Sequence, residues 1–250
     1  MKINLNIANK NCLLQVDNDR WYRFLMEKYR KFVIRDDSKP DMNLKIVIRS
    51  KRAKITHSFD GAKRGYILFF PDNLRRFKRF NTYFKFFFSN LLLLQNEGFL
   101  LHASALKINK ESYIFCGKQG SGKSTILKLA PEYDPLNDDA AIIKTFKGKF
   151  LIQSSPFYEK NRIKKLNVLL PINKVFFLQK AKKNQLYQPK AAQKLRRLIS
   201  NVYIKKESKE INQLIYTNLN SLCYNMVKYV PMYVMAFKKD KSFINMILKK

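Results

Sequence analysis

The stretch of this chain that most constrains its fold is a glycine-rich loop placed between a strand and a helix. Residues 117–125 read Gly-Lys-Gln-Gly-Ser-Gly-Lys-Ser-Thr, which matches the phosphate-loop pattern G-x-x-x-x-G-K-[ST] in full. The apolar residues 113–116 predict a strand directly before the loop, and residues 126–129 predict a helix directly after it. A glycine-rich turn that arose by chance would need neither the lysine nor the serine in this setting. We therefore expect an α/β fold that binds phosphate groups at the end of a strand.

Each residue type in this loop has a chemical role. Glycines let the backbone turn and aim its N–H groups at phosphate oxygens. Lys123 can reach the β- and γ-phosphates of a nucleotide, and the hydroxyl of Ser124 can ligate Mg²⁺. The loop thus predicts ATP and Mg²⁺ as ligands. The residues predicted to bind the nucleotide are Gly117, Gly120, Ser121, Gly122, Lys123, Ser124 and Thr125.

A histidine is expected beside this loop. If residues 109–110 form a two-residue hairpin turn, Ile108 pairs with Glu111, and cross-strand partners have numbers that sum to 219. His102 then lies opposite Gly117, next to the predicted phosphate site. A hydrogen-bonded structural histidine at the end of a strand is the alternative that the sequence leaves open.

Two adjacent carboxylates follow the predicted helix. Asp138 and Asp139 stand just before the apolar segment that begins at Ala140, so they fall at the edge of a predicted strand. In extended backbone their side chains point to opposite faces, so one can face a metal ion and the other an incoming hydroxyl. A solvated Asn-Asp-Asp turn is the alternative. Because phosphoryl transfer at a phosphate loop needs an acidic magnesium partner, we favour the functional interpretation.

Hydrophobic periodicity predicts the remaining elements and a division into an N-terminal α+β region, residues 1–95, and a catalytic domain, residues 96–250. The first region is predicted to contain a helix over 20–29, strands over 43–48 and 66–70, and a turn at Asp60-Gly61. It is also predicted to contain a helix that begins near Asp72 and buries Phe77, Phe80, Phe84, Phe87, Phe88, Leu91 and Leu94. The second is predicted to contain a hairpin over 140–144 and 150–153, a strand over 175–178, helices over 191–199 and 208–229, and a strand over 233–237. The inner face of the 208–229 helix is predicted to hold Ile211, Leu214, Ile215, Leu219, Leu222 and Met226.

The charge of the chain admits two interpretations. Lys and Arg number 50 against 18 Asp and Glu, which gives a formal net charge of +32. An AT-rich genome enriches Lys beside Asn and Ile through codon bias, without selection on function. Alternatively, the charge attracts an anion such as a nucleic acid, an anionic membrane surface or an acidic peptide.

The location of the protein and the state of its cysteines can also be predicted. No apolar stretch approaches the about 18–20 residues of a membrane helix, and residues 1–6 alternate like an amphipathic strand rather than a signal peptide. We therefore expect no membrane span and a cytoplasmic location. Cys12, Cys116 and Cys223 lie far apart and predict neither a disulfide framework nor a zinc site.

The order of these motifs resembles that of the HPr serine kinase family. The resemblance covers roughly residues 66–237 and rests on His102-Ala103-Ser104-Ala105, the phosphate loop, Asn137-Asp138-Asp139, Ser155-Pro156-Phe157 and Pro171–Leu178. It is closer to the smaller HPr-kinase-related proteins, found near peptide-modification and lasso-peptide genes. It implies a P-loop kinase of the phosphoenolpyruvate-carboxykinase type with a mixed sheet.

The same resemblance implies the roles of the site residues. Asp138 would be the base that faces the acceptor hydroxyl, Asp139 a magnesium ligand, and His102 the histidine beside the phosphates. Two features differ from the bacterial HPr kinase/phosphorylases. Thr125 stands where they have an acidic residue, and their Gly- and Arg-rich stretch, which supports phosphorolysis, is missing. We therefore expect a kinase without phosphorylase activity. Whether HPr or another molecule is the acceptor is left open.

The leading interpretation is a kinase that transfers the γ-phosphoryl group of ATP to a serine-type hydroxyl of an acidic peptide or protein, in the setting of ribosomal-peptide modification. Arg162 and Lys165 are candidates for acceptor binding, with a solvated basic loop as the alternative. A regulatory or nucleic-acid-binding ATPase and a kinase of free serine or a sugar are the other candidates. The sequence is also compatible with a homo-oligomer.

Overall fold

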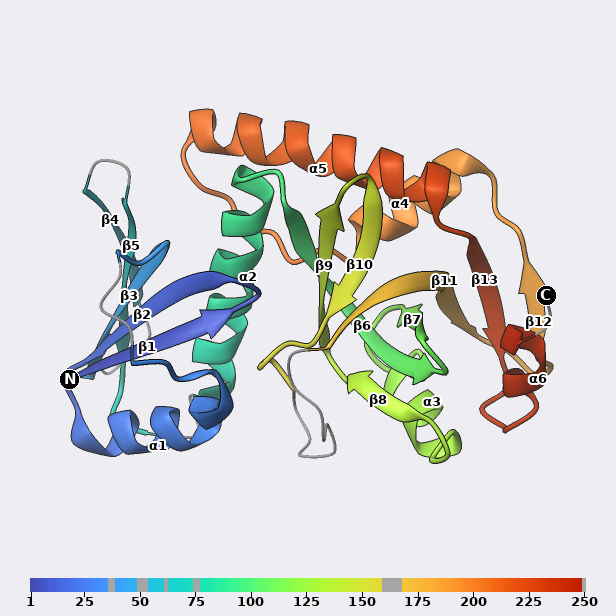
Figure 1. Cartoon of the computed structure of the whole chain (residues 1–250), viewed down its shortest axis with the longest axis horizontal. Coiled ribbons are helices and arrows are strands. Elements are labelled where there is room, and N and C mark those ends of the chain that lie inside the picture. The colour runs from blue at the N-terminus through green and yellow to red at the C-terminus, as the bar shows by residue number, and fades with distance from the viewer. Residues whose placement is uncertain (36–38, 49–53, 61–62, 74–76, 159–167, 249–250) are drawn as a thin grey trace. The chain divides into compact units, whose positions relative to one another are not determined.

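A computed structural model describes residues 1–250 except 36–38, 49–53, 61–62, 74–76, 159–167 and 249–250 (Figure 1). The chain divides into two compact units, Met1–Leu91 and Leu92–Lys250. Among the described residues, no helix is both long enough and apolar enough to cross a membrane.

The first unit is built on a five-stranded mixed sheet with the order β1-β2-β3-β5-β4. Its strands are β1 (Lys2–Ile7), β2 (Lys10–Val16), β3 (Met42–Ile48), β4 (Lys54–Asp60) and β5 (Lys63–Phe70). β1 and β2 form a hairpin, whereas β2, β3 and β5 run parallel to one another. The crossover from β2 to β3 passes through α1 (Asp19–Tyr29) and the short 3-10 helix η1 (Arg30–Phe32). The predicted strands over 43–48 and 66–70 lie within β3 and β5.

Aromatic side chains of α1 and α2 (Phe77–Leu94) pack on one face of this sheet. Trp21 stacks on Phe70 with ring centroids 5.6 Å apart, and Tyr66 stacks on Phe87 at 3.7 Å. Phe80, Phe84 and Phe87 are completely buried. The interleaved aromatic and basic residues of α2 therefore belong to a core helix, because rings that stack on nucleic-acid bases must be exposed.

The expected start of α2 near Asp72 falls beside residues 74–76, which lie outside the described part of the chain. Asp72 and Asn73 are not helical, and α2 is described from Phe77. The backbone N–H of Asn73 donates to the carbonyl of Pro71 at 2.7 Å, which holds a tight turn there. The turn expected at residues 60–61 lies partly outside the described residues. By contrast, α1 has a full N-cap, since Asn18 accepts a hydrogen bond from the N–H of Trp21 at 3.0 Å.

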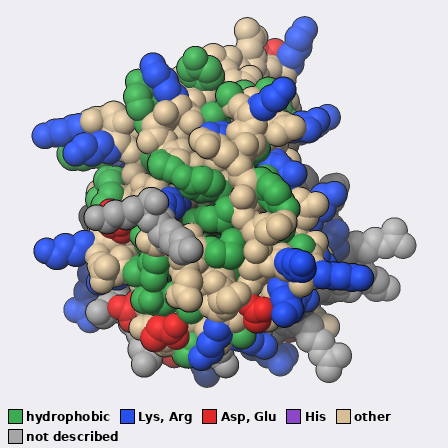
Figure 2. Space-filling model, turned by 90° about the vertical axis from the view of Figure 1, so that its right-hand side faces the viewer, with side chains coloured by type: hydrophobic (Ala, Val, Ile, Leu, Met, Phe, Trp, Pro, Cys, Tyr) green, Lys and Arg blue, Asp and Glu red, His purple; other side chains and the backbone are tan. Residues whose placement is uncertain are grey.

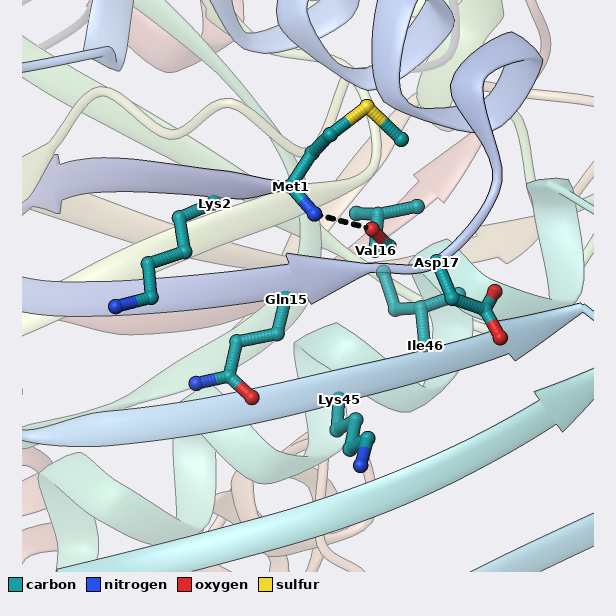
Figure 3. Close-up of a pocket in the computed structure, with 7 residues that line it drawn as sticks. All are labelled: Met1, Lys2, Gln15, Val16, Asp17, Lys45 and Ile46. Carbon is teal, nitrogen blue, oxygen red and sulfur yellow. Dashed lines mark hydrogen bonds between the residues drawn. The ribbon is translucent and has the colours of Figure 1, made fainter.

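A shallow cavity of about 280 Å³ opens at one end of the first sheet (Figure 3). Lys2, Gln15 and Lys45 are register partners on neighbouring strands and line it as one cross-strand row. The amino group of Met1 donates to the carbonyl of Val16 at 2.8 Å, and Asp17 accepts from the N–H of Ile48 at 2.9 Å. These hydrogen bonds stabilise the end of the sheet.

The second unit is an α/β structure around an eight-stranded mixed sheet with the order β10-β9-β6-β7-β11-β13-β12, and β8 pairs with β6. This confirms the expected fold class. Its strands are β6 (Gly98–Ile108), β7 (Glu111–Cys116), β8 (Asp134–Asn137), β9 (Ala140–Phe146), β10 (Lys149–Gln153), β11 (Leu169–Lys180), β12 (Gln185–Tyr187) and β13 (Met232–Phe237). Its helices are α3 (Lys123–Leu129), α4 (Ala191–Ile199), α5 (Lys209–Tyr229) and α6 (Phe243–Leu248). Neither β8, β12 nor α6 was expected from the sequence.

The β6–β7 hairpin has the register expected from a two-residue turn. Ile108 pairs with Glu111 and Ala103 pairs with Cys116, so partner numbers sum to 219 throughout. The predicted hairpin of β9 and β10 also forms, and its turn residues Lys147 and Gly148 have φ angles of 48° and 73°. Such positive φ angles fit the right-handed twist of paired strands.

The sheet of the second unit is covered on both faces, as Figure 1 shows for α5 and α3. Alternate strand residues feed two separate hydrophobic clusters, because side chains of a strand point to opposite faces in turn. One cluster joins Ile114 and Phe177 to α4 and α5, and the other joins Phe115 and Phe176 to α3 and α6. The predicted inner face of α5 is correct except at Leu214, which is 48% exposed.

Candidate functional site

The glycine-rich loop lies at the edge of the sheet where several strands end together. β7 pairs in parallel with β11, and β11 pairs in parallel with β13, so their carboxyl ends meet at one edge. The loop connects the end of β7 to α3. Ligands of open α/β sheets bind at this edge, outside the carboxyl ends of parallel strands.

Two glycines of the loop are required by close packing. A side chain at Gly117 would place its Cβ 2.6 Å from the hydroxyl oxygen of Ser121. At Gly122, where φ is +114°, the Cβ would lie 2.9 Å from the ring of Phe237. The loop therefore keeps its compact shape only with glycine at these positions.

Polar groups inside the loop are arranged to receive an anion. Lys123 is only 8% exposed, and its ammonium group donates to the carbonyls of Gly117 at 2.6 Å and Lys118 at 3.4 Å. The hydroxyl of Ser121 is buried and has no hydrogen-bond partner among the described residues. Since a buried polar atom without a partner is costly, phosphate oxygens would satisfy a need that the loop leaves open.

The start of α3 is tied to β6. Ser104 donates through its hydroxyl to the backbone carbonyl of Lys123 at 3.1 Å. Ser124, the predicted magnesium ligand, is exposed on the first turn of α3, and Thr125 is half-buried. Burial raises the pKa of the Cys116 thiol, directly before the loop, to about 12, although the charge of Lys123 acts in the opposite direction. This thiol is therefore protonated at neutral pH.

The two aspartates follow β8, on the other side of β6 from the phosphate loop. β7 and β8 both run antiparallel to β6, so they end at the same edge of the sheet. With neighbouring strands about 4.8 Å apart, the backbones of the loop and the aspartates lie roughly 10 Å from each other across the edge. The triphosphate chain of a nucleoside triphosphate, together with a bound metal ion, has a length of this order.

The aspartates do not lie in extended backbone. Asp138 and Asp139 form a bend between β8 and β9, so strand alternation does not decide where their side chains point. Burial separates them instead, because Asp139 is buried and Asp138 is half-buried. The sequence argument from opposite strand faces was therefore wrong in its geometry.

Asp139 is held between a predicted residue and an unpredicted one. Nε2 of His102 lies 3.4 Å from a carboxylate oxygen of Asp139. The hydroxyl of Tyr203 lies within 3.4 Å of both oxygens of the same carboxylate, as a long hydrogen bond. The backbone N–H of Ala103 also donates to the Asp139 carbonyl at 3.0 Å. His102 thus contacts the acidic residue directly, and it lies one residue beyond Ala103, which pairs with Cys116 just before the phosphate loop.

A buried amide supports the bend. Asn137 donates through its side chain to the carbonyl of Ala140 at 2.6 Å and to the hydroxyl of Ser155 at 3.0 Å. Ser155 in turn donates to the same Ala140 carbonyl at 2.6 Å. These hydrogen bonds join Asn137 and Ala140, the residues on either side of Asp138 and Asp139, and so fix both ends of the bend.

The segment after α4 completes the arrangement. The N–H of His102 donates to the carbonyl of Asn201 at 2.7 Å, and the N–H of Tyr203 donates to the carbonyl of Leu100 at 2.9 Å. This short antiparallel contact along β6 brings Tyr203 to Asp139. The sequence does not predict this contact, because residues 201–203 show neither strand periodicity nor a turn that would fix their register.

A cavity of about 490 Å³ opens beside the phosphate loop. Of the described predicted site residues, Gly117 and Ser121 line it, and the others do not, namely His102, Gly120, Gly122, Lys123, Ser124, Thr125, Asp138 and Asp139. The other walls come from the end of β11 and the end of α4, namely Phe177, Leu178, Gln179, Lys180, Arg197, Ser200 and Asn201. Arg162 and Lys165 lie outside the described residues.

These residues fit a nucleotide with Mg²⁺. The orphaned Ser121 hydroxyl, the buried Lys123 ammonium and the close-packed glycines suit phosphate oxygens. Among the described residues, no group of three or more His, Cys, Asp or Glu side chains could hold a metal ion. Mg²⁺ is usually bound through one or two carboxylates together with substrate phosphates and water, so a hydroxyl and a single carboxylate are a sufficient donor set.

Comparison with known proteins places the second unit in a family. The family model described as SynChlorMet cassette protein ScmC matches residues 87–249. A solved structure of the HPr(Ser) kinase/phosphatase from Coxiella burnetii aligns over 52% of this chain and 93% of its own, with 13% sequence identity and a TM-score of 0.26. A likeness of that size says nothing about activity. No curated protein matches the chain.

Proposed function

The chain belongs to the family of the SynChlorMet cassette protein ScmC, and we propose that its second unit is an ATP-dependent kinase. The acceptor would be a serine-type hydroxyl on an acidic peptide or protein. One observation carries this proposal. A phosphate loop with a buried lysine and an orphaned serine shares its sheet edge with a pair of aspartates.

In this proposal the loop and Lys123 hold the phosphates and neutralise the charge that develops on them during transfer. Ser124 and Asp139 would hold Mg²⁺, which supplies further neutralisation of the phosphate oxygens when bound. His102 and Tyr203 orient the Asp139 carboxylate, from 3.4 Å each. Asp138 is the less buried carboxylate, and it accepts the proton of the acceptor hydroxyl.

The test is direct phosphorylation. The full chain is incubated with Mg²⁺, ATP carrying a labelled γ-phosphate, and the peptides encoded beside its gene. Transfer of label to a serine-containing peptide supports the proposal, and the free amino acid serine and simple sugars are run in parallel. Label that appears only as inorganic phosphate would support an ATPase instead.

The alternative of a nucleic-acid-binding ATPase is not supported by the aromatic residues of α2. A platform that stacks bases needs exposed rings, and Phe80, Phe84 and Phe87 are buried. Lys and Arg side chains stand around the margin of the face seen in Figure 2, with hydrophobic side chains towards its middle, rather than in one basic patch. The codon-bias interpretation of the surplus lysine is compatible with this distribution.

A further inference from the structure

The wall of the cavity that faces away from α3 carries a cation that the sequence does not mark. Arg197 belongs to α4, which packs on the opposite face of the sheet from α3, yet it lines the same cavity as the phosphate loop. Lys118 and Lys180 also line this cavity, and none of the described residues that line it is Asp or Glu. A cavity with this charge suits an anion with several phosphates.

The backbone at Arg197 is held in place. Its carbonyl accepts two side-chain hydrogen bonds, from the Ser200 hydroxyl at 2.9 Å and from the Asn201 amide at 2.8 Å. The carbonyl of Asn201 in turn accepts from the N–H of His102 on β6 at 2.7 Å. The neighbouring Leu198 is completely buried in the core. Arg197 is therefore positioned relative to the strand that pairs with β7, without relying on a mobile loop.

Electrostatics explains why a cation is needed here. The carboxyl end of a helix carries a partial negative charge, which would repel phosphates brought to the end of α4. Arg197 lies in the last turn and offsets this charge. Its side chain has no ion pair or hydrogen bond among the described residues, so its five donors are available to a ligand.

We propose that Arg197 binds the terminal phosphoryl group of a nucleoside triphosphate, from the side of the cavity opposite the phosphate loop. This inference rests on nucleotide binding in the proposed function. A planar guanidinium group can donate two parallel hydrogen bonds to phosphate oxygens, whereas a lysine acts as a point charge. A nucleoside diphosphate, which lacks the terminal group, would lose nothing when Arg197 is removed.

The chain offers a matched control in the adjacent residue. Arg196 has the same chemistry and the same helix, but it is exposed and does not line the cavity. Affinities of ATP and ADP, both with Mg²⁺, are measured by titration calorimetry for the full chain and for Arg197→Ala, Arg197→Lys and Arg196→Ala. We expect Arg197→Ala to weaken ATP by roughly 10- to 100-fold and ADP hardly at all. Arg197→Lys should recover part of the loss, and Arg196→Ala should match the parent.

Other results separate this inference from the proposed function. Equal losses for ATP and ADP, or equal behaviour of the Arg196 and Arg197 variants, would overturn the role of Arg197 and leave the kinase proposal standing. ATP-specific loss in a protein that phosphorylates no acceptor would support Arg197 and count against the kinase. A parent chain that binds neither nucleotide would overturn both. Thermal melting of each variant shows whether it is folded, and Arg197→Lys preserves the test if Arg197→Ala is not.

Discussion

Lys123 is a buried ammonium group whose partners include carbonyl oxygens of its own loop. Those hydrogen bonds satisfy the charge while no phosphate is present. In the proposed nucleotide complex, phosphate oxygens would replace these carbonyls, and the interaction would be stronger because both partners would be charged and sheltered from water. The same Lys123 ammonium group therefore stabilises the folded loop and is proposed to bind the ligand.

We expect Lys123→Ala to abolish phosphoryl transfer and to leave the chain folded, because the lysine contacts the loop rather than either hydrophobic cluster. Transfer is measured with labelled ATP, and folding by circular dichroism. Lys128→Ala, an exposed lysine on the same helix, is the control. Turnover equal to that of the parent would contradict the assignment.

The two aspartates should separate in their effects. Asp138→Asn removes the proposed base, so we expect the rate of transfer to fall by about 10²–10⁴-fold with Mg·ATP binding retained. Asp139→Asn removes the proposed metal ligand and should weaken Mg·ATP binding as well. Nucleotide affinity and single-turnover rates are measured for both variants. Reversed phenotypes would exchange the two roles, and identical ones would reject the division.

The three cysteines should resist modification in the folded chain. Burial raises the pKa of Cys116 and of Cys223 to about 12, and it raises that of Cys12 further. Because the thiolate is the reactive form, we expect almost no reaction with a thiol reagent at pH 8, and three thiols after unfolding. In the unfolded chain these thiols ionise near their ordinary pKa, whereas in the folded chain they stay protonated. Rising pH therefore favours the unfolded state, and the free energy of unfolding should fall above about pH 9. Rapid reaction of any thiol in the native protein would show that its burial is incomplete.

At the scale of elements, β6 is the strand that organises the site. It lies between β7, which ends at the phosphate loop, and β8, which ends at the aspartates, and it carries His102 and Ser104 on one face. Residues 201–203 pair with the part of β6 that extends past β7. Among the described residues, the phosphate loop, the aspartates and Tyr203 are therefore all positioned by contacts with β6.

The packing of β6 against β9 can be tested at Gly98, the first residue of β6. Gly98 has φ of +153°, and a Cβ there would lie 1.9 Å from the carbonyl oxygen of Ile143 on β9. We expect Gly98→Ala to lower the free energy of unfolding by about 3 kcal/mol, through collision and backbone strain together. Gly148→Ala is the control, since Gly148 also has a positive φ but open space around it, and about 1 kcal/mol is expected there. Denaturant unfolding measures both, and equal losses would show that the contact with β9 is not tight.

At the scale of the whole molecule, the formal net charge of +32 remains the feature with two explanations. If it serves to capture an acidic peptide, acceptor affinity should fall steeply between low and physiological salt, because exposed charges are screened over about 8–10 Å. ATP affinity should fall less, since buried loop groups hold its phosphates. Both affinities are measured across the same salt series.

Charge reversal at Arg162 and Lys165 separates a local from a general effect. We expect it to weaken acceptor affinity and leave ATP affinity unchanged. The same reversal at Lys107, near the end of β6, and at Lys110, in the β6–β7 turn, is the control. If acceptor affinity is flat across the salt series, genome composition is the better explanation of the surplus lysine.

The sequence by itself determined the features that depend on short stretches of chain. The phosphate loop, the 219 register of β6 and β7, and the bounds of α4 all follow from local spacing, because a two-residue turn sets register and helical periodicity repeats within four residues. Only the tertiary structure showed that Tyr203 contacts Asp139, 64 residues away in the chain, and that Arg197 reaches the cavity of the phosphate loop. The sequence also left open whether Asp138 lies in a strand or in a turn, and the structure places it in a bend. These contacts depend on how elements pack across the two faces of one sheet, and no periodicity within a segment records which distant segment will lie beside it.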